Sequence, residues 1–167
     1  MKKLHPLLIA VLIYSSSIAQ FTSDMNFSDI YGNTINPTSI LNEGKYIYLD
    51  FFSTTCGACN SVASEVANAY EYYGSNNENI FFLGVDYNSS TSACLNFANQ
   101  HNSDFPIISG QQGGIDIFNL FLQSGYPSGR LINPSGVSEA IFSYSQIASL
   151  TESLSEFISP VENCDFI

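Results

Sequence analysis

Two continuous apolar runs stand out along the chain, and each is short enough to be a single buried strand. Residues 45–53 read Lys-Tyr-Ile-Tyr-Leu-Asp-Phe-Phe-Ser, and residues 80–85 read Ile-Phe-Phe-Leu-Gly-Val. A strand that is apolar on both faces is typical of the centre of a covered sheet. Shorter strands are expected at residues 105–108, 129–133 and 137–142, and the last two flank an Asn-Pro-Ser-Gly turn, which predicts a hairpin.

Helical spacing of apolar residues fills most of the chain between these strands. Val62, Val66, Ala69 and Tyr73 recur every three or four positions and Gly74 follows them, which predicts one helix and its end. Strands that alternate with helices predict a single α/β domain, in which a central mixed β-sheet has helices on both faces. The expected helices lie at residues 37–41, 57–73, 91–100, 115–123 and 146–158, and an edge strand is expected near residues 25–27.

The first 19 residues are typical of a secretory signal peptide and are not expected to belong to the fold. Two lysines precede an apolar run at residues 7–14, and small residues follow it up to Ala19. The run is too short to span a membrane, which requires about 20 residues. We therefore expect cleavage between Ala19 and Gln20, a single domain over residues 20–167, and a protein exported to the periplasm or the medium.

Removal of this segment leaves a strongly acidic chain. All 15 acidic residues follow Ala19, whereas only Lys45 and Arg130 remain basic, so the net charge is 2 − 15 = −13. Such a surface repels polyanions, which excludes nucleic-acid binding. The acidic residues are scattered rather than clustered, and this is typical of a well-solvated surface.

A Cys-x-x-Cys motif, Cys56-Gly57-Ala58-Cys59, lies where the first buried strand should end and a helix should begin. Unpaired N–H groups at a helix start stabilise a thiolate, which is the form of cysteine that attacks disulfides. Cys56 would therefore be the nucleophile, and Cys59 would resolve the mixed disulfide. A zinc site is a weaker interpretation, because no second close pair of Cys or His accompanies the motif. A purely structural disulfide would close too short a loop to constrain the unfolded chain much. No metal or other cofactor is expected.

Two stretches of the chain resemble the signatures of thioredoxins. The first runs from Tyr48 to Cys59, and the second is Gly125-Tyr126-Pro127 followed by Leu131 to Gly136. The insertion between Asp86 and Ile115 resembles that of the exported TlpA/ResA-like branch, and the resemblance covers roughly residues 25–159. It implies a thioredoxin fold with an N-terminal extension and a central insertion.

The resemblance also implies roles for residues near the cysteines. Pro127 would be a cis-proline beside the pair, and the backbone of Tyr126 would bind an extended substrate segment. Gly57 and Ala58 would belong to the same substrate contact. The chain departs from the family where Thr55 replaces the usual Trp and Ala58 replaces a common Pro.

Asp50 matches the buried carboxylate of many thioredoxins, and it lies inside an apolar strand. Loss of solvation should raise the pKa of this carboxyl group. The carboxylate could then accept the proton of Cys59 as that sulfur attacks. The alternative is an aspartate that reaches solvent or caps a neighbouring segment.

Together these features predict a thiol–disulfide oxidoreductase that acts on exported protein disulfides, and the resemblance favours reduction. The expected partners are exported protein thiols and disulfides and a membrane or soluble electron-donor protein, and the chain is expected to be a monomer. One alternative is a peroxiredoxin-like peroxidase with Ser53 before the cysteine and Arg130 to stabilise a peroxide, although Leu49 stands where that family has a proline. Another alternative is a non-catalytic thioredoxin-like binding module.

Two further cysteines, Cys94 and Cys164, lie outside the motif. In an exported protein they could form a second, structural disulfide that ties the C-terminal tail to the insertion. In the alternative interpretation, Cys94 is a small buried apolar residue and Cys164 is a thiol in a frayed tail.

Overall fold

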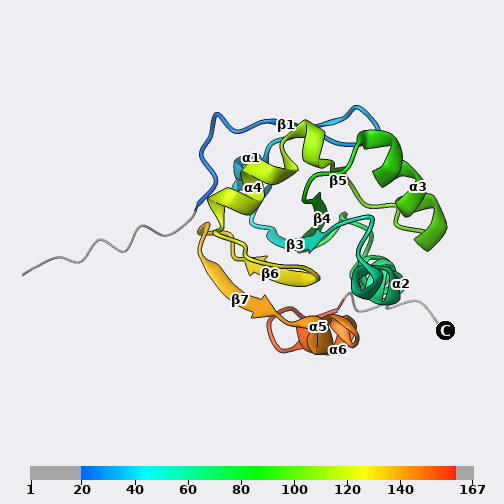
Figure 1. The fold of residues 1–167 in the computed structure, drawn as a ribbon. Helices are drawn as coiled ribbons and strands as arrows, with labels where there is room; N and C mark the ends of the chain where they lie inside the picture. The colour runs from blue at the N-terminus through cyan, green and yellow to red at the C-terminus, as the bar shows by residue number, and fades with distance from the viewer. Residues whose placement is uncertain (1–19, 161–167) are drawn as a thin grey trace, which may run out of the picture.

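The computed structural model describes residues 20–160, and its main feature is a five-stranded mixed sheet (Figure 1). The strand order is β5-β4-β3-β6-β7, so β3 lies at the centre. It pairs in parallel with β4 and antiparallel with β6, which also forms the expected hairpin with β7. The strands are β3 (Tyr46–Phe52), β4 (Ile80–Asp86), β5 (Ile107–Ile108), β6 (Ser128–Ile132) and β7 (Ser138–Phe142).

Helices cover both faces of this sheet, as the alternation of elements predicts (Figure 1). One face packs against α2 (Gly57–Tyr72), which also contacts α3 (Thr91–His101), α5 (Tyr144–Ile147) and α6 (Leu150–Ser155). The other face packs against α1 (Pro37–Asn42) and α4 (Gly114–Leu120). The α/β fold class expected from the sequence is therefore confirmed.

The side chains of β3 alternate between these two apolar layers. Ile47, Leu49 and Phe51 pack on the side of α1 and α4, whereas Tyr48 and Phe52 pack on the side of α2. Successive residues of a strand point to opposite faces, so Asp50 faces the layer of α2. The strand that precedes the Cys-x-x-Cys motif thus places a carboxyl group on the same side of the sheet as the helix that follows it.

The N-terminal segment differs from the predicted edge strand. β1 (Phe27–Ser28) pairs only with β2 (Thr34–Ile35), and the two form a separate antiparallel sheet. The turn between them is fixed by Asp29, whose carboxylate accepts hydrogen bonds from the backbone N–H groups of Tyr31 and Asn33. β1 therefore pairs with the nearby strand β2 instead of with an edge strand of the main sheet.

The last predicted helix, over residues 146–158, is in fact two short helices, α5 and α6. The break lies at Ser149, whose φ of −137° and ψ of 48° are not helical. Apolar periodicity continues across the break, because Ile147, Leu150 and Leu154 are all fully buried against the same layer. Burial of one face was predicted correctly, whereas continuity of the backbone was not.

Two expectations concern residues outside the described range. These are the signal peptide at residues 1–19 and the pairing of Cys94 with Cys164. Across residues 20–160, the structure contains no helix that is both long enough and apolar enough to cross a membrane.

Candidate active site

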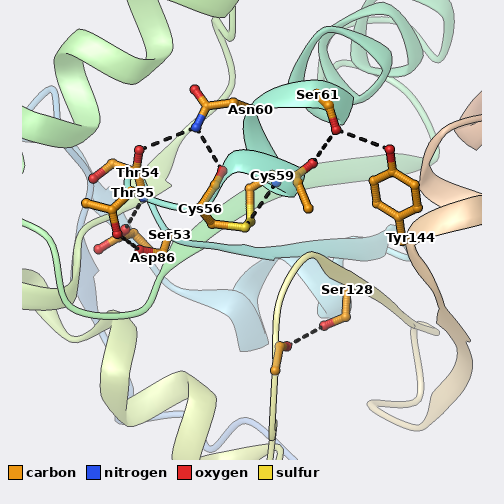
Figure 2. Close-up of a disulfide and its surroundings, with 12 residues drawn as sticks. Ser53, Thr54, Thr55, Cys56, Cys59, Asn60, Ser61, Asp86, Ser128 and Tyr144 are labelled. Atoms are coloured by element: carbon orange, nitrogen blue, oxygen red, sulfur yellow. Dashed lines mark hydrogen bonds between the residues drawn. A yellow bond between two sulfur atoms is a disulfide. The ribbon is translucent and has the colours of Figure 1, made fainter.

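Cys56 and Cys59 are joined as a disulfide at the start of α2 (Figure 2). Cys56 is the N-cap residue of the helix, with an extended backbone, and the Cα atoms of the two cysteines are 5.2 Å apart. The Sγ atom of Cys56 accepts a hydrogen bond from the backbone N–H of Cys59, at 3.1 Å. An N–H group of the first helical turn therefore already points at this sulfur, as a helix start that stabilises a thiolate requires.

The two sulfurs differ in their access to solvent. Cys56 is half-buried and is followed by the exposed residues Gly57 and Ala58, whereas only 2% of Cys59 is exposed. A disulfide that approaches from outside can reach Cys56 first, and Cys59 only through Cys56. The burial pattern therefore matches the expected division of roles between the two cysteines.

A buried carboxylate, that of Asp86 at the end of β4, holds the loop that leads to Cys56 (Figure 2). Its Oδ1 atom accepts hydrogen bonds from the backbone N–H of Thr54, at 3.3 Å, and from the hydroxyl of Ser89, at 2.8 Å. Its Oδ2 atom accepts from the backbone N–H groups of Ser89 and Gly110. Sequence analysis did not identify this residue, because its partners come from three separate segments.

Asn60 fixes the same turn from the helix side. Its side-chain amide donates to the backbone carbonyl of Cys56, at 2.8 Å, and its Oδ1 atom lies 3.0 Å from Nε2 of His101 in α3. Burial lowers the pKa of His101. Cys56 is thus connected through one amide side chain to the end of the inserted helix, a link that the sequence gave no signal to find.

Tyr144 lies on the other side of the motif, where α5 approaches α2 (Figure 2). Its hydroxyl is 3.2 Å from that of Ser61, which in turn donates to the backbone carbonyl of Ala58, at 2.7 Å. The Tyr144 side chain is 47% exposed. It therefore forms part of the rim that an incoming protein would meet.

Asp50 lies beneath this surface, in the layer that contains Cys59. It is 6% exposed, and loss of solvation raises the pKa of its carboxyl group to about 7. Both of its cross-strand neighbours, Gly84 of β4 and Gly129 of β6, are glycines. The expected burial of this carboxyl group and the expected direction of its pKa shift are both confirmed.

The Tyr126-Pro127 peptide bond is cis, as the resemblance implies. Ser128, the next residue, pairs with Phe51 near the end of β3, so Pro127 lies beside the strand end that leads to Cys56. Tyr126 is 39% exposed and Pro127 is half-buried. The two sequence signatures, although far apart along the chain, therefore meet at one edge of the sheet.

A pocket of about 400 Å³ opens beside this loop. Its aromatic rings pack against one another. The centroid of the Tyr87 ring lies 5.2 Å from that of Phe118 and 5.9 Å from that of Tyr126. Leu122, just before the pocket-lining residues, is 86% exposed and has a φ of 50°, in the left-handed region. The pocket is lined by Tyr87, Phe118, Gln123, Ser124, Gly125 and Tyr126, none of which is charged.

Arg130 and Cys94 are the other sequence candidates within the described residues. The guanidinium group of Arg130 lies over the ring of Phe121, 5.3 Å from its centre, and donates to the Phe121 carbonyl. Phe121 belongs to the layer of α1 and α4, so Arg130 does not face Cys59, and the expectation that it could stabilise a peroxide there finds no support. Cys94 is buried in the layer of α2, where burial raises the pKa of its thiol to about 12, and Cys164 lies outside the described residues.

Comparison with known proteins agrees with this geometry. The model of the AhpC/TSA family matches residues 18–137, which is well over half of the 167 residues. The chain belongs to the AhpC/TSA family. Among curated members of related sequence, the thiol-disulfide oxidoreductase ResA of Bacillus subtilis (strain 168) is 25% identical over 155 residues, which cover 92% of this chain and 83% of ResA.

Solved structures show that this AhpC/TSA member has the thioredoxin fold. The thioredoxin domain of a thiol-disulfide oxidoreductase from Bacteroides vulgatus superimposes with a TM-score of 0.67 at 16% identity, over 86% of this chain and 99% of that domain. A secreted disulfide oxidoreductase from Mycobacterium tuberculosis superimposes with a TM-score of 0.62 at 18% identity, over 79% and 95% of the two chains. Among residues 20–160, no three His, Cys, Asp or Glu side chains are grouped so that they could hold a metal ion.

Proposed function

We propose that this protein is a thiol–disulfide oxidoreductase that acts on the disulfides of exported proteins, with Cys56 as nucleophile and Cys59 as resolving cysteine. The observation that carries the proposal is the disulfide at the start of α2. Its Cys56 sulfur is on a half-buried residue, whereas Cys59 is buried in the layer that Asp50 faces. The similarity to ResA along nearly the whole chain supports it.

In the first step, the Cys56 thiolate of the reduced enzyme attacks one sulfur of a substrate disulfide. A bond forms between Cys56 Sγ and that sulfur, the substrate disulfide breaks, and the second substrate sulfur leaves as a thiolate. N–H groups at the start of α2 favour the thiolate over the thiol, and the Cys59 N–H already points at this sulfur.

In the second step, Cys59 resolves the mixed disulfide. Its proton passes to the Asp50 carboxylate, and its sulfur attacks Cys56 Sγ, so that the enzyme disulfide forms and the first substrate sulfur leaves. Two electrons have then moved from the enzyme to the substrate. A carboxyl group with a pKa of about 7 exchanges protons readily at neutral pH, which suits it to the role of base.

We assign substrate binding to the surface around the cis-proline loop. An extended substrate segment would pair with the backbone of Tyr126 beside Pro127, while Gly57 and Ala58 leave space in front of Cys56. A large apolar or aromatic side chain of that segment would enter the pocket between Tyr87 and Tyr126, because the pocket is lined by aromatic rings and contains no charge.

We assign the direction of electron flow as reduction of substrate disulfides, in keeping with the resemblance to the ResA-like branch. Each turnover leaves the enzyme as the Cys56–Cys59 disulfide, so a membrane or soluble donor protein must reduce it again. The reduction potential of the pair tests this assignment. A value near about −270 mV supports a reductant, and a value near about −120 mV would instead make the protein an oxidant.

Cleavage of the N-terminal segment and export of the mature chain complete the proposal. The apolar run and the small residues before Gln20 support it, as does the secreted relative from M. tuberculosis. N-terminal sequencing of the exported protein should begin at Gln20. An intact N-terminus on the protein recovered from the cell would contradict cleavage.

Replacement of single cysteines tests the two-cysteine mechanism. C59S should accumulate mixed disulfides with substrate proteins, because nothing resolves them, whereas C56S should accumulate none. C94S is the comparison variant, because it removes a cysteine outside the motif and keeps both Cys56 and Cys59, so it should accumulate no mixed disulfides. If C59S reduces insulin at the native rate, the mechanism is wrong. If the enzyme turns over hydroperoxides faster than it reduces disulfides, the peroxidase alternative is favoured. If C56S still binds its substrate proteins, the alternative of a non-catalytic binding module is favoured.

A further inference from the structure

Tyr48 carries the most conspicuous polar group in the interior that the proposed mechanism does not use. The side chain is fully buried, and its hydroxyl has no hydrogen-bond partner among residues 20–160. Its ring is held between Phe82 and Phe142, at centroid distances of 5.3 and 5.7 Å. Buried polar groups in folded proteins nearly always have a partner, so an unpartnered hydroxyl in a rigid position indicates a partner in another state of the protein.

The surroundings of Asp50 identify that partner. Tyr48 and Asp50 are two residues apart on β3 and therefore face the same layer. The cross-strand neighbours of Asp50 on both sides are glycines, Gly84 and Gly129. Different side chains fill the space that a Cβ atom of each glycine would take. A methyl group on Gly84 would meet apolar atoms of Ile107, Phe105 and Phe52.

On the other side of Asp50, the space beside Gly129 is filled by the Tyr48 hydroxyl. Tyr48 pairs with Leu131, yet its side chain leans along the sheet so far that a methyl group on Gly129 would overlap its hydroxyl. Gly129 is the direct cross-strand partner of Asp50. Of the side-chain groups that fill the two glycine spaces, the Tyr48 hydroxyl alone can donate a hydrogen bond.

We propose that the Tyr48 hydroxyl is the hydrogen-bond donor that holds the Asp50 carboxylate in its ionised form and so positions the base of the resolving step. The inference rests on the proposed function, in which the ionised carboxylate of Asp50 accepts the proton of Cys59. When Asp50 is ionised, a small rotation of its carboxylate, or one intervening water, joins the carboxylate to the Tyr48 hydroxyl. Tyr48 is a positioning residue, since it touches neither sulfur nor substrate.

Other titratable groups in this layer compete little with this assignment. On this face β6 places Gly129 and Leu131, and β4 places Phe82, Gly84 and, at its end, the buried carboxylate of Asp86. That carboxylate is held by donors from Thr54, Ser89 and Gly110, and the pKa of Asp50 is raised by loss of solvation. The glutamates of α2 and α6 are exposed at the surface. The remaining titratable side chains in or against this layer are Tyr46 of β3, Cys56, Cys59 and Tyr70 at or in α2, Tyr73 just after it, Cys94 and His101 of α3 and Tyr144 of α5. Cys56 and Cys59 do not titrate in the disulfide state.

The test is Y48F, which removes the hydroxyl and keeps the ring between its two aromatic neighbours. The Asp50 carboxyl is titrated by carbon NMR in the oxidised protein, and the rate of the resolving step is measured against pH. We expect the Asp50 pKa to rise by about one unit or more, as a hydrogen bond to a charged group implies. The midpoint of the pH profile should rise with it, while the rate of the first attack stays unchanged.

The matched control is Y73F, which also removes a buried tyrosine hydroxyl. That hydroxyl donates to the backbone carbonyl of Thr151, away from Asp50, so Y73F should leave both readouts unchanged. An Asp50 pKa that stays constant or falls in Y48F would overturn the inference, as would an equal shift in Y73F. The NMR titration needs no turnover, so it separates failure of this inference from failure of the proposed function, which the single-cysteine variants test.

Discussion

The two buried aspartates around the active site, Asp50 and Asp86, have opposite surroundings. The carboxylate of Asp86 accepts hydrogen bonds from the backbone N–H groups of Thr54, Ser89 and Gly110 and from the hydroxyl of Ser89. Asp50 lies in an apolar layer, and no side chain of that layer neutralises its charge. A carboxylate with several donors is stable when ionised, whereas one in an apolar layer, with the Tyr48 hydroxyl as its single proposed donor, is still costly to ionise. At the residue scale, Asp86 therefore holds the active-site loop in place, and Asp50 has the raised pKa that the proposed role of base requires.

This contrast predicts how stability depends on pH. The pKa of Asp50 is about 7 in the folded protein, against 3.8 for an ordinary carboxyl, so the folded chain keeps a proton that the unfolded chain has released between these values. Stability should therefore fall as pH rises through this window, by at most on the order of 4 kcal/mol. D50N should remove that loss, so that urea unfolding shows a gain over the native protein at pH 8 and little difference at pH 4.

D86N is the matched comparison for this prediction. It exchanges one carboxylate oxygen for an amide group that cannot accept, so at least one buried donor is left without a partner. We expect a loss of about 2 kcal/mol at pH 8, where D50N gains. Equal losses in both variants at pH 8 would contradict the assignment of Asp50 as an uncompensated buried acid.

At the scale of elements, the segment that follows α4 contains a leucine in an unfavourable backbone conformation. The helix was predicted to extend to residue 123 but ends at Leu120, and Leu122 takes a left-handed backbone with its side chain in solvent. A leucine in this region costs free energy that glycine or asparagine would largely avoid. Because Leu122 directly precedes the residues that line the pocket, we expect its exposed side chain to belong to the proposed substrate surface.

L122N tests that use. Asparagine tolerates the left-handed region, so we expect the variant to be as stable as the native protein or up to about 1 kcal/mol more stable. Loss of the apolar side chain should raise KM for protein substrates severalfold and leave kcat unchanged. Y72A, which removes an exposed tyrosine near the far end of α2, should leave both constants unchanged. An unchanged KM in L122N would exclude Leu122 from the substrate surface.

At the scale of the whole molecule, charge is the dominant property. Residues 20–167 carry a net charge of −13, and one of the two basic side chains, Lys45, lies 3.9 Å from the carboxylate of Glu43. The other, Arg130, is half-buried against Phe121. The protein therefore presents an almost uniformly negative field to any approaching partner.

That field predicts a dependence of rate on salt. Cysteine peptides that are matched except for net charge should react fastest with the enzyme when they are cationic. The advantage should be severalfold at low ionic strength and should shrink as salt shortens the screening length to below about 10 Å. Equal rates for cationic and anionic peptides at low salt would show that the field does not reach the active site.

Much of this architecture could be predicted because it depends on local patterns. The apolar runs of β3 and β4, the Cys-x-x-Cys motif and Asp50 were all visible in the sequence. The role of Asp86 was not, because its partners lie on segments that meet only in three dimensions. The position of the Tyr48 hydroxyl depends on its register with Gly129, and the break at Ser149 interrupts a periodicity that itself continues. Such features depend on tertiary contacts rather than on spacing along the chain.

The position of β3 at the centre of the sheet also determines when the active site can form. β3 precedes the motif, yet its antiparallel neighbour β6 ends only at Ile132, and the buried residues of α6 come later still. Under the proposed export, the part of the chain that holds both cysteines therefore crosses the membrane long before the segments that cover them. During this interval Cys59 is as reachable as Cys56, so oxidants outside the cell act on both thiols alike. The first oxidation state of the pair is then decided by the compartment, and only the completed fold gives each sulfur its separate role.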